Sequence, residues 1–178
     1  LAHEGLTFNA PLSDERADAL VAALPISPGH HALDLGCGWG ELLLRILAAH
    51  PAPTGTGVDT AKDALDRGVR AAAQRGLHER VELVEADVGT FVDIADIVIS
   101  VASSHAFGGA VDALHRLRQS VAPGGRVLFG DGFWAAEPTS AALETIGPLP
   151  RLDDLRTAAR QAGFLIERDE VSTLAEWD

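Results

Sequence analysis

The sequence predicts an α/β protein in three layers, with a mainly parallel sheet covered by helices on both faces. Short apolar stretches alternate along the chain with longer stretches whose apolar residues recur at helical spacing. A turn with three glycines joins the first apolar stretch to the helical stretch after it. Regular alternation of strands and helices produces parallel strands, and the connecting helices then cover both faces of the sheet.

The elements can be predicted in chain order. A first helix is expected over residues 13–25, because Ser13 has the side chain of an N-cap and Pro25 ends the apolar pattern. Gly76 is placed to end the third helix in the left-handed conformation. Further helices are predicted over residues 40–51, 61–76, 109–121 and 152–164, and strands over residues 30–36, 55–59, 81–87, 95–102, 126–134 and 165–173.

Composition narrows the class of protein. The chain has 178 residues with 14 basic and 26 acidic side chains, which suits one domain over residues 1–178. An acidic surface repels phosphate backbones, and no apolar run approaches the roughly 18 residues of a membrane span, so neither nucleic acid nor a membrane is expected. The single cysteine, Cys37, fits a reducing, cytoplasmic location. The sequence has no methionine and begins at Leu1, so we expect it to be part of a longer product.

The glycine turn, LDLGCGWGE, is the first candidate ligand site. Its glycines, Gly36, Gly38 and Gly40, have the spacing G-x-G-x-G, which differs from the G-x-G-x-x-G fingerprint of dinucleotide-binding proteins. Asp34 lies just before the turn, where a carboxylate opposes a pyrophosphate and favours a cationic amine or sulfonium. Both features argue against a nicotinamide dinucleotide.

Two further acids end predicted strands at the same edge of the sheet, where open α/β sheets bind their ligands. Asp59 lies about 20 residues beyond the turn, where an acidic side chain can bind both hydroxyls of a ribose. Asp87 can accept from an adenine amino group while the amide of Val88 donates to a ring nitrogen. With Asp34, these residues describe a site for a nucleoside with a positively charged tail and no phosphate.

These motifs resemble those of class I S-adenosylmethionine-dependent methyltransferases. LDLGCGWGE is similar to the family's first motif, GVD to the motif after the second strand, EADV to the motif after the third, and LRQSVAPGGRVLFGD to the helix, turn and fifth-strand block. The resemblance covers roughly residues 13–173 and extends to small-molecule-type bacterial enzymes, many without an assigned substrate. It implies a Rossmann-like sandwich with strand order 3-2-1-4-5-(7)-6, S-adenosylmethionine as cofactor and a small organic methyl acceptor.

The resemblance also implies a set of cofactor-binding residues that follow the first four strands: Asp34, Gly36, Gly38, Trp39, Asp59, Thr60, Asp87, Val88 and Ser100. The first four belong to the methionine side, Asp59 to the ribose, the next three to the adenine, and Ser100 to the floor of the site. N-terminal segments of this family often fold over the cofactor, so residues 1–12 are a candidate lid in which Phe8, Asn9 and Leu12 contact ligand. An ordinary arm is the alternative.

Methyl transfer from a sulfonium is an in-line displacement with a neutral leaving group, so the protein must align the acceptor, exclude water and, where needed, remove a proton. The candidate residues follow the fourth and fifth strands: Ser103, Ser104, His105, Asp131, Phe133 and Trp134. His105 is the expected base or hydrogen-bonding partner, since imidazole titrates near neutrality, with a helix cap as the alternative. Asp131 either contacts the acceptor or holds its loop, and the two aromatic residues either wall a pocket or pack in the core.

Departures from related patterns narrow the prediction further. SVASSH lacks the Asn/Asp-Pro-Pro-aromatic signature of enzymes that methylate DNA bases, and no Asp-Asn pair follows Asp131 as in metal-dependent catechol O-methyltransferases. We therefore expect no metal, and we expect the usual antiparallel seventh strand to be absent from this chain. Two rival functions stay open: a non-catalytic S-adenosylmethionine-binding module, and a nicotinamide oxidoreductase, which the glycine spacing and Asp34 oppose.

Overall fold

The computed structural model describes residues 8, 10–173 and 176, and its centre is a five-stranded parallel sheet in the order β3-β2-β1-β4-β5. The strands are β1 (His31–Leu35), β2 (Thr54–Asp59), β3 (Val81–Glu85), β4 (Ala95–Val101) and β5 (Val121–Gly130). The helices are α1 (Asp14–Ala23), α2 (Glu41–Ala49), α3 (Lys62–Gln74), α4 (Ala110–Ser120), α5 (Ser140–Ile146) and α6 (Leu152–Gln161). The predicted order of the first five strands is confirmed.

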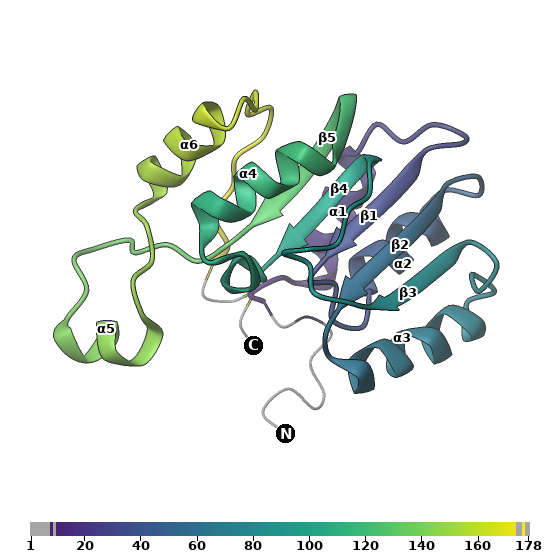
Figure 1. Ribbon diagram of the computed structural model, residues 1–178, viewed down its shortest axis with the longest axis horizontal. Coiled ribbons are helices and arrows are strands. Elements are labelled where there is room, and N and C mark those ends of the chain that lie inside the picture. Colours follow the sequence, from purple (N-terminus) through teal and green to yellow (C-terminus); the bar gives the residue numbers. More distant parts are fainter. Residues whose placement is uncertain (1–7, 9, 174–175, 177–178) are drawn as a thin grey trace.

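Helices cover both faces of the sheet (Figure 1). Ala32 of β1, with Ile97 and Ile99 of β4, belongs to a core that also contains residues of α1, α2 and α3. The alternate strand residues Leu33 and Val98 belong to a second core, on the α4 side. Because β1 and β4 are buried on both faces, their sequences are almost continuously apolar rather than alternating.

Local signals fix the helix ends that the sequence predicts. The Ser13 hydroxyl accepts a hydrogen bond from the amide of Arg16 at 3.2 Å and so caps α1. Gly76, after α3, has a φ of 69°, in the left-handed region. The sequence prediction missed α5, although Thr139 caps it and Gly147 follows it. Because α5 has no buried residue, no apolar periodicity reveals it.

The described residues 165–173 form no strand, so the prediction of a sixth strand there is wrong. A strand there would need an apolar side to bury, but Leu165 and Val171 are exposed. Ion pairs to β5, α6 and α1 hold the segment instead: Arg126–Glu167, Arg156–Asp169 and Arg16–Glu170. Side-chain charges therefore replace the backbone ladder that a strand would need.

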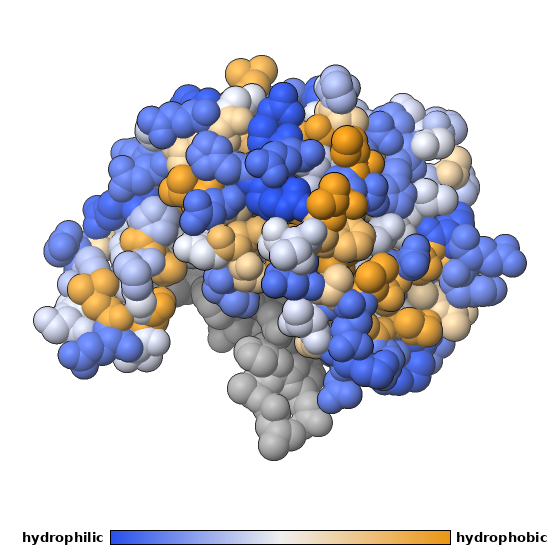
Figure 2. Space-filling view, viewed as in Figure 1, coloured by the Kyte–Doolittle hydropathy of each residue, from blue (hydrophilic) through white to orange (hydrophobic). Residues whose placement is uncertain are grey.

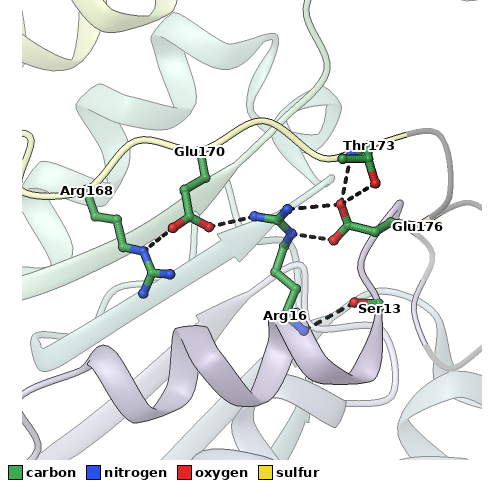
Figure 3. Close-up of polar contacts among 6 residues, drawn as sticks. All are labelled: Ser13, Arg16, Arg168, Glu170, Thr173 and Glu176. Atoms are coloured by element: carbon green, nitrogen blue, oxygen red, sulfur yellow. Dashed lines mark hydrogen bonds and ion pairs between the residues drawn. The ribbon is translucent and has the colours of Figure 1, made fainter.

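Arg16 on α1 anchors this C-terminal segment (Figure 3). Its guanidinium pairs with Glu170 at 2.6 Å and with both carboxylate oxygens of Glu176. The amide and hydroxyl of Thr173 donate to the same Glu176 at 2.7 and 3.1 Å. These bonds, that from Arg16 foremost, lower the pKa of Glu176 to about 2, so the carboxylate stays charged through mildly acidic pH.

The surface is largely hydrophilic on the face seen in Figure 2, where apolar side chains are scattered among charged ones. The exposed large apolar residues include Val92 and Ile94, between β3 and β4. Among the residues that the structure describes, no helix is both long and apolar enough to cross a membrane.

Replacing Arg16 with Gln should release the segment 165–173 from α1, because Glu170 and Glu176 both lose the cation that ties them to this helix. We expect faster hydrogen exchange in the segment and a fall in thermal midpoint of no more than about 2–4 °C, since surface ion pairs contribute little to stability. Arg168→Gln is the matched control, because Arg168 pairs with Glu170 inside the segment itself. Equal exchange rates in the two variants would contradict the anchoring role of Arg16.

Candidate functional site

A cleft of about 320 Å³ opens at the edge of the sheet where the parallel strands end. The arrowheads of the strands in Figure 1 point toward this edge. The cleft is lined by residues that follow β1, β2, β3 and β4, by the first residues of α2, and by Phe8 and Ala10 from the start of the chain. It therefore lies where ligands bind in open α/β sheets.

The glycine turn forms the floor of the cleft and is attached to the end of β2. Gly36, Gly38 and Gly40 have φ values of 80°, 55° and 78°, in the region that favours glycine. The Gly36 amide donates to the carbonyl of Val58 at 2.9 Å, and the Gly38 amide donates to Asp59 Oδ2 at 2.7 Å. These bonds fix the position of the turn relative to the end of β2.

The segment after β4 presses on the same turn. A Cβ on Gly36 would lie 2.3 Å from Ser103 Cβ, so the backbone approaches this serine more closely than any other residue type would allow. Ser103 Oγ donates to the carbonyl of Leu35 at 3.0 Å and lies 2.7 Å from Ser100 Oγ. Ala102 reaches this arrangement with a φ of 56°, a conformation that non-glycine residues rarely adopt.

Asp34 is a buried carboxyl that lines the cleft with 4% of its surface exposed. Burial first, and the negative charge of Asp59 second, raise the pKa of Asp34 to about 7. The group is thus poised to change protonation near neutral pH, and a cation beside it would favour the ionised form.

Asp59 and Asp87 present carboxylates from the ends of β2 and β3. Asp59 accepts from the amides of Gly38 and Ala61 at 2.7 and 2.8 Å. A carboxylate has about four lone-pair sites, so about two remain for a ligand with neighbouring hydroxyls. Asp87 accepts from the amide of Gly89 at 2.8 Å, which holds its side chain at the rim of the cleft.

The structure brings most of the predicted site residues together. Those that line the cleft are Asp34, Gly36, Gly38, Trp39, Asp59, Thr60, Asp87, Val88 and His105. Ser100 is 1% exposed and lies behind Ser103, to which it is hydrogen-bonded. Asp131 is not part of the lining, and its Oδ1 accepts from the amide of Gly132 in the loop after β5.

The other candidates divide between cleft, core and loop. Phe8 and Ser103 line the cleft, whereas Leu12 is buried in the core with α1 and α2. Asn9 lies outside the described residues. Trp134 is partly buried, and its backbone amide donates to the carbonyl of Pro150 at 2.9 Å, which closes the loop between β5 and α6.

Sequence reasoning missed Glu41, which lines the cleft and is 6% exposed. The available signal was an acid directly after the glycine turn, at the first residue of a helix. Acids are common there because they complement the helix dipole, so the position alone did not indicate a site.

Cys37 lines the cleft but is not suited to act as a nucleophile. Burial, and then the charges of Asp34 and Asp59, raise the pKa of its thiol well above the usual range, so it stays protonated. Within residues 8, 10–173 and 176, no three His, Cys, Asp or Glu side chains are grouped to hold a metal ion.

The parallel sheet, the glycine turn and the acids at the strand ends define a nucleoside-binding class of α/β protein. Comparison with known families identifies it further: the model of the methyltransferase domain matches residues 33–127, and the chain belongs to that family. It is 33% identical over 135 residues to the uncharacterized protein YjhP of Escherichia coli, covering 75% of this chain and 54% of that protein.

Two further relatives are informative. A trans-aconitate 2-methyltransferase of Paracidovorax citrulli is 32% identical over 122 residues, covering 63% of this chain and 44% of that protein. The crystal structure of an S-adenosylmethionine-dependent methyltransferase from Thiobacillus denitrificans, in complex with S-adenosylhomocysteine, superposes with a TM-score of 0.86 at 27% identity, covering 99% of this chain and 74% of that one. This chain thus spans about half the length of the curated relatives.

The contact between Gly36 and Ser103 can be measured by comparing two alanine variants. Gly36 and Gly29 have nearly the same φ, 80° and 84°, but a Cβ on Gly29 would meet nothing within 4 Å. We expect Gly29→Ala to lose about 1–2 kcal/mol of unfolding free energy from its backbone alone, and Gly36→Ala to lose about 1–3 kcal/mol more from the clash. Urea unfolding measures the free energy of unfolding of both variants. Equal losses would show that Ser103 and the segment after β4 move away from the new Cβ at no energetic cost.

Proposed function

We propose that this chain carries the cofactor site and the reaction centre of an S-adenosylmethionine-dependent methyltransferase with a small organic acceptor. One observation carries the proposal: the glycine turn and the carboxylates of Asp34, Asp59 and Asp87, from three different strand ends, line a single cleft. Membership of the methyltransferase-domain family supports methyl transfer. The S-adenosylhomocysteine bound to the Thiobacillus denitrificans neighbour supports the cofactor.

The residues of the cleft fit the chemistry of this cofactor. Asp34 would face the ammonium group of the methionine part, where Gly36, Gly38 and Trp39 line the cleft. Asp59 would accept from the ribose hydroxyls, while Thr60, Asp87 and Val88 would surround the adenine. Ser100 would act from beneath, by holding Ser103 against the glycine turn.

The reaction requires the protein to align the acceptor with the methyl group, to exclude water and, where needed, to remove a proton. S-adenosylmethionine supplies a methyl group on a sulfonium whose departure leaves a neutral thioether, so no acid is needed. His105 has an exposed side chain at the cleft, where it can accept the proton of a hydroxyl or amine acceptor or hold that acceptor by a hydrogen bond. Asp131 lies outside the cleft and would contact only an acceptor that extends toward the end of β5.

The charge of the cleft favours a neutral or cationic acceptor. Four carboxyl groups line it, those of Asp34, Glu41, Asp59 and Asp87, and none of the described lining residues is Lys or Arg. A polyanion would therefore meet carboxyl groups and no Lys or Arg among the described lining residues. For this reason we do not propose trans-aconitate, after which three of the relatives are named, as the acceptor of this chain.

We propose that the whole sequence forms one functional unit built around the cleft. Residues 1–178 would act as one methyltransferase domain, in which residues 1–12 form a lid, since Phe8 and Ala10 already line the cleft. A cytoplasmic location would keep Cys37 reduced. The competing proposals are a binding module without turnover and, less favoured by the acids of the cleft, a nicotinamide oxidoreductase.

Two variants separate binding from chemistry. Asp59→Ala should weaken S-adenosylhomocysteine binding about tenfold to a hundredfold by calorimetry, because a pair of hydrogen bonds is lost. Asp66→Ala is the control, an exposed acid on α3 that pairs with Lys62. His105→Ala should bind S-adenosylhomocysteine like the wild type but transfer labelled methyl groups more slowly, by about a hundredfold if His105 is the base.

The same measurements decide between the rival functions. Methyl transfer is assayed on metabolite fractions separated by charge, and turnover is expected in the neutral or cationic fractions. Binding of S-adenosylhomocysteine without turnover in any fraction would favour the binding module. Tight binding of NADH without binding of S-adenosylhomocysteine would overturn the proposal altogether.

The raised pKa of Asp34 predicts that cofactor binding depends on pH. Below pH 7 the ligand-free carboxyl is protonated and must release its proton to hold an ammonium group; above pH 7 it is already ionised. The affinity for S-adenosylhomocysteine should therefore rise as pH increases from 5.5 to 7, by up to about tenfold per unit, and level off above. Calorimetry in buffers of different ionisation enthalpy should detect the released proton, and Asp34→Asn should flatten the profile. A slope that survives in Asp34→Asn would assign it to another group.

A further inference from the structure

Glu41 is a buried carboxylate beside the cleft that the cofactor contacts proposed above do not use. It is the first residue of α2, directly after Gly40, and 6% of its surface is exposed. Burial of a charge is costly unless partners surround it. Two arginines do so: Arg45 Nε donates to Glu41 Oε1 and Arg75 Nη2 donates to Glu41 Oε2, each at 2.7 Å.

These two arginines connect Glu41 to the helices on both sides. Arg45 lies one turn further along α2 and also pairs with Asp14 and Asp18 of α1. Arg75 comes directly after α3. Each oxygen of Glu41 thus holds a guanidinium from a different direction, and the carboxylate joins three helices next to the cleft.

Each arginine also lies over an aromatic ring that lines the cleft. Arg45 Cζ is 5.3 Å from the centre of the Phe8 ring, and Arg75 Cζ is 5.9 Å from that of Trp39. Arg67 stacks on Trp39 as well, at 4.0 Å. Because a guanidinium is attracted to the face of an aromatic ring, the positions of the arginines bias the positions of both rings.

We propose that Glu41 is a positioning residue for the cofactor, which holds Trp39 in place through Arg75 and shares with Asp14 and Asp18 the placing of Arg45 over Phe8. The inference rests on the proposed function, because these two rings would enclose the methionine side of bound S-adenosylmethionine. The negative charge and the second oxygen are what matter: a glutamine has nearly the same shape but places an NH2 donor where one of the two guanidinium groups needs an acceptor. Arg45 keeps Asp14 and Asp18 when Glu41 is lost, so the change falls chiefly on Arg75 and Trp39.

The test compares Glu41→Gln with a matched control, Glu167→Gln, which breaks the exposed pair with Arg126 of β5; neither residue lines the cleft. Glu41→Gln should bind S-adenosylhomocysteine at least about tenfold more weakly by calorimetry, and Glu167→Gln should bind it like the wild type. The chain has 3 tryptophans, so Trp39 emission is recorded with the other two replaced by Phe. Glu41→Gln should shift this emission before any ligand is added, which a general loss of stability in the folded protein would not do.

Each outcome bears on one of the two proposals. A wild-type protein that fails to bind S-adenosylhomocysteine would overturn the proposed function itself. Wild-type binding with an unchanged Glu41→Gln affinity, an unchanged Trp39 emission, or an equal loss in Glu167→Gln would overturn the role of Glu41. If Glu41→Gln does not fold, Arg75→Gln is used, because it leaves Arg45 on the buried carboxylate; unchanged binding and emission in that variant would equally overturn the role.

Discussion

The whole site depends on how the glycine turn is fixed between two strand ends. From the β2 side, Asp59 accepts from the Gly38 amide, and from the β4 side, Ser103 lies against Gly36. Next to the turn, the ladder between β1 and β2, in which Asp34 pairs with Gly57, sets the separation of Asp34 and Asp59. Burial first, and the nearby charge of Asp59 second, raise the pKa of Asp34 at this edge. The fold therefore maintains an unfavourable arrangement that a bound cation would relieve.

The acids of the cleft differ in whether the protein supplies a cation to them, and this difference matches their proposed roles. Arg45 and Arg75 neutralise Glu41 within the protein, so its charge stabilises the positions of these side chains. Asp34 is instead kept beside another carboxylate, and its charge is available to a ligand. Buried carboxylates with a protein cation stabilise a conformation, whereas those without one are the candidates for binding and for pH dependence.

The sequence predicted the order of the five strands and most of the residues that line the cleft, because both follow from local sequence patterns. Buried strands are continuously apolar, and a residue just after such a strand must lie at the carboxyl edge of a parallel sheet; Asp59 and Asp87 could be placed on that basis. Ser100 was predicted to lie under the ligand, but Ser103 lines the cleft and Ser100 lies behind it; the left-handed Ala102 between the two gives no signal in the sequence. Likewise, residues 165–173 were predicted to form a strand, but they are held by long-range ion pairs such as that of Arg16, which the local sequence does not show. Glu41 was missed because its partners are distant in sequence.

The charge of the cleft also has a consequence for the direction of the proposed reaction. S-adenosylmethionine carries a sulfonium and an ammonium against one carboxylate, whereas S-adenosylhomocysteine has lost the sulfonium charge. Both keep the ammonium and the ribose, so contacts of Asp34 and Asp59 with those groups hold substrate and product alike. Only the field of the surrounding carboxyl groups distinguishes the two, and at an effective dielectric constant of about 20 it amounts to a few kcal/mol at contact distance. The cleft is lined by four carboxyl groups, those of Asp34, Glu41, Asp59 and Asp87, so it would bind S-adenosylmethionine more tightly than S-adenosylhomocysteine. The charge of Glu41 contributes less to this difference, because Arg45 and Arg75 neutralise part of it.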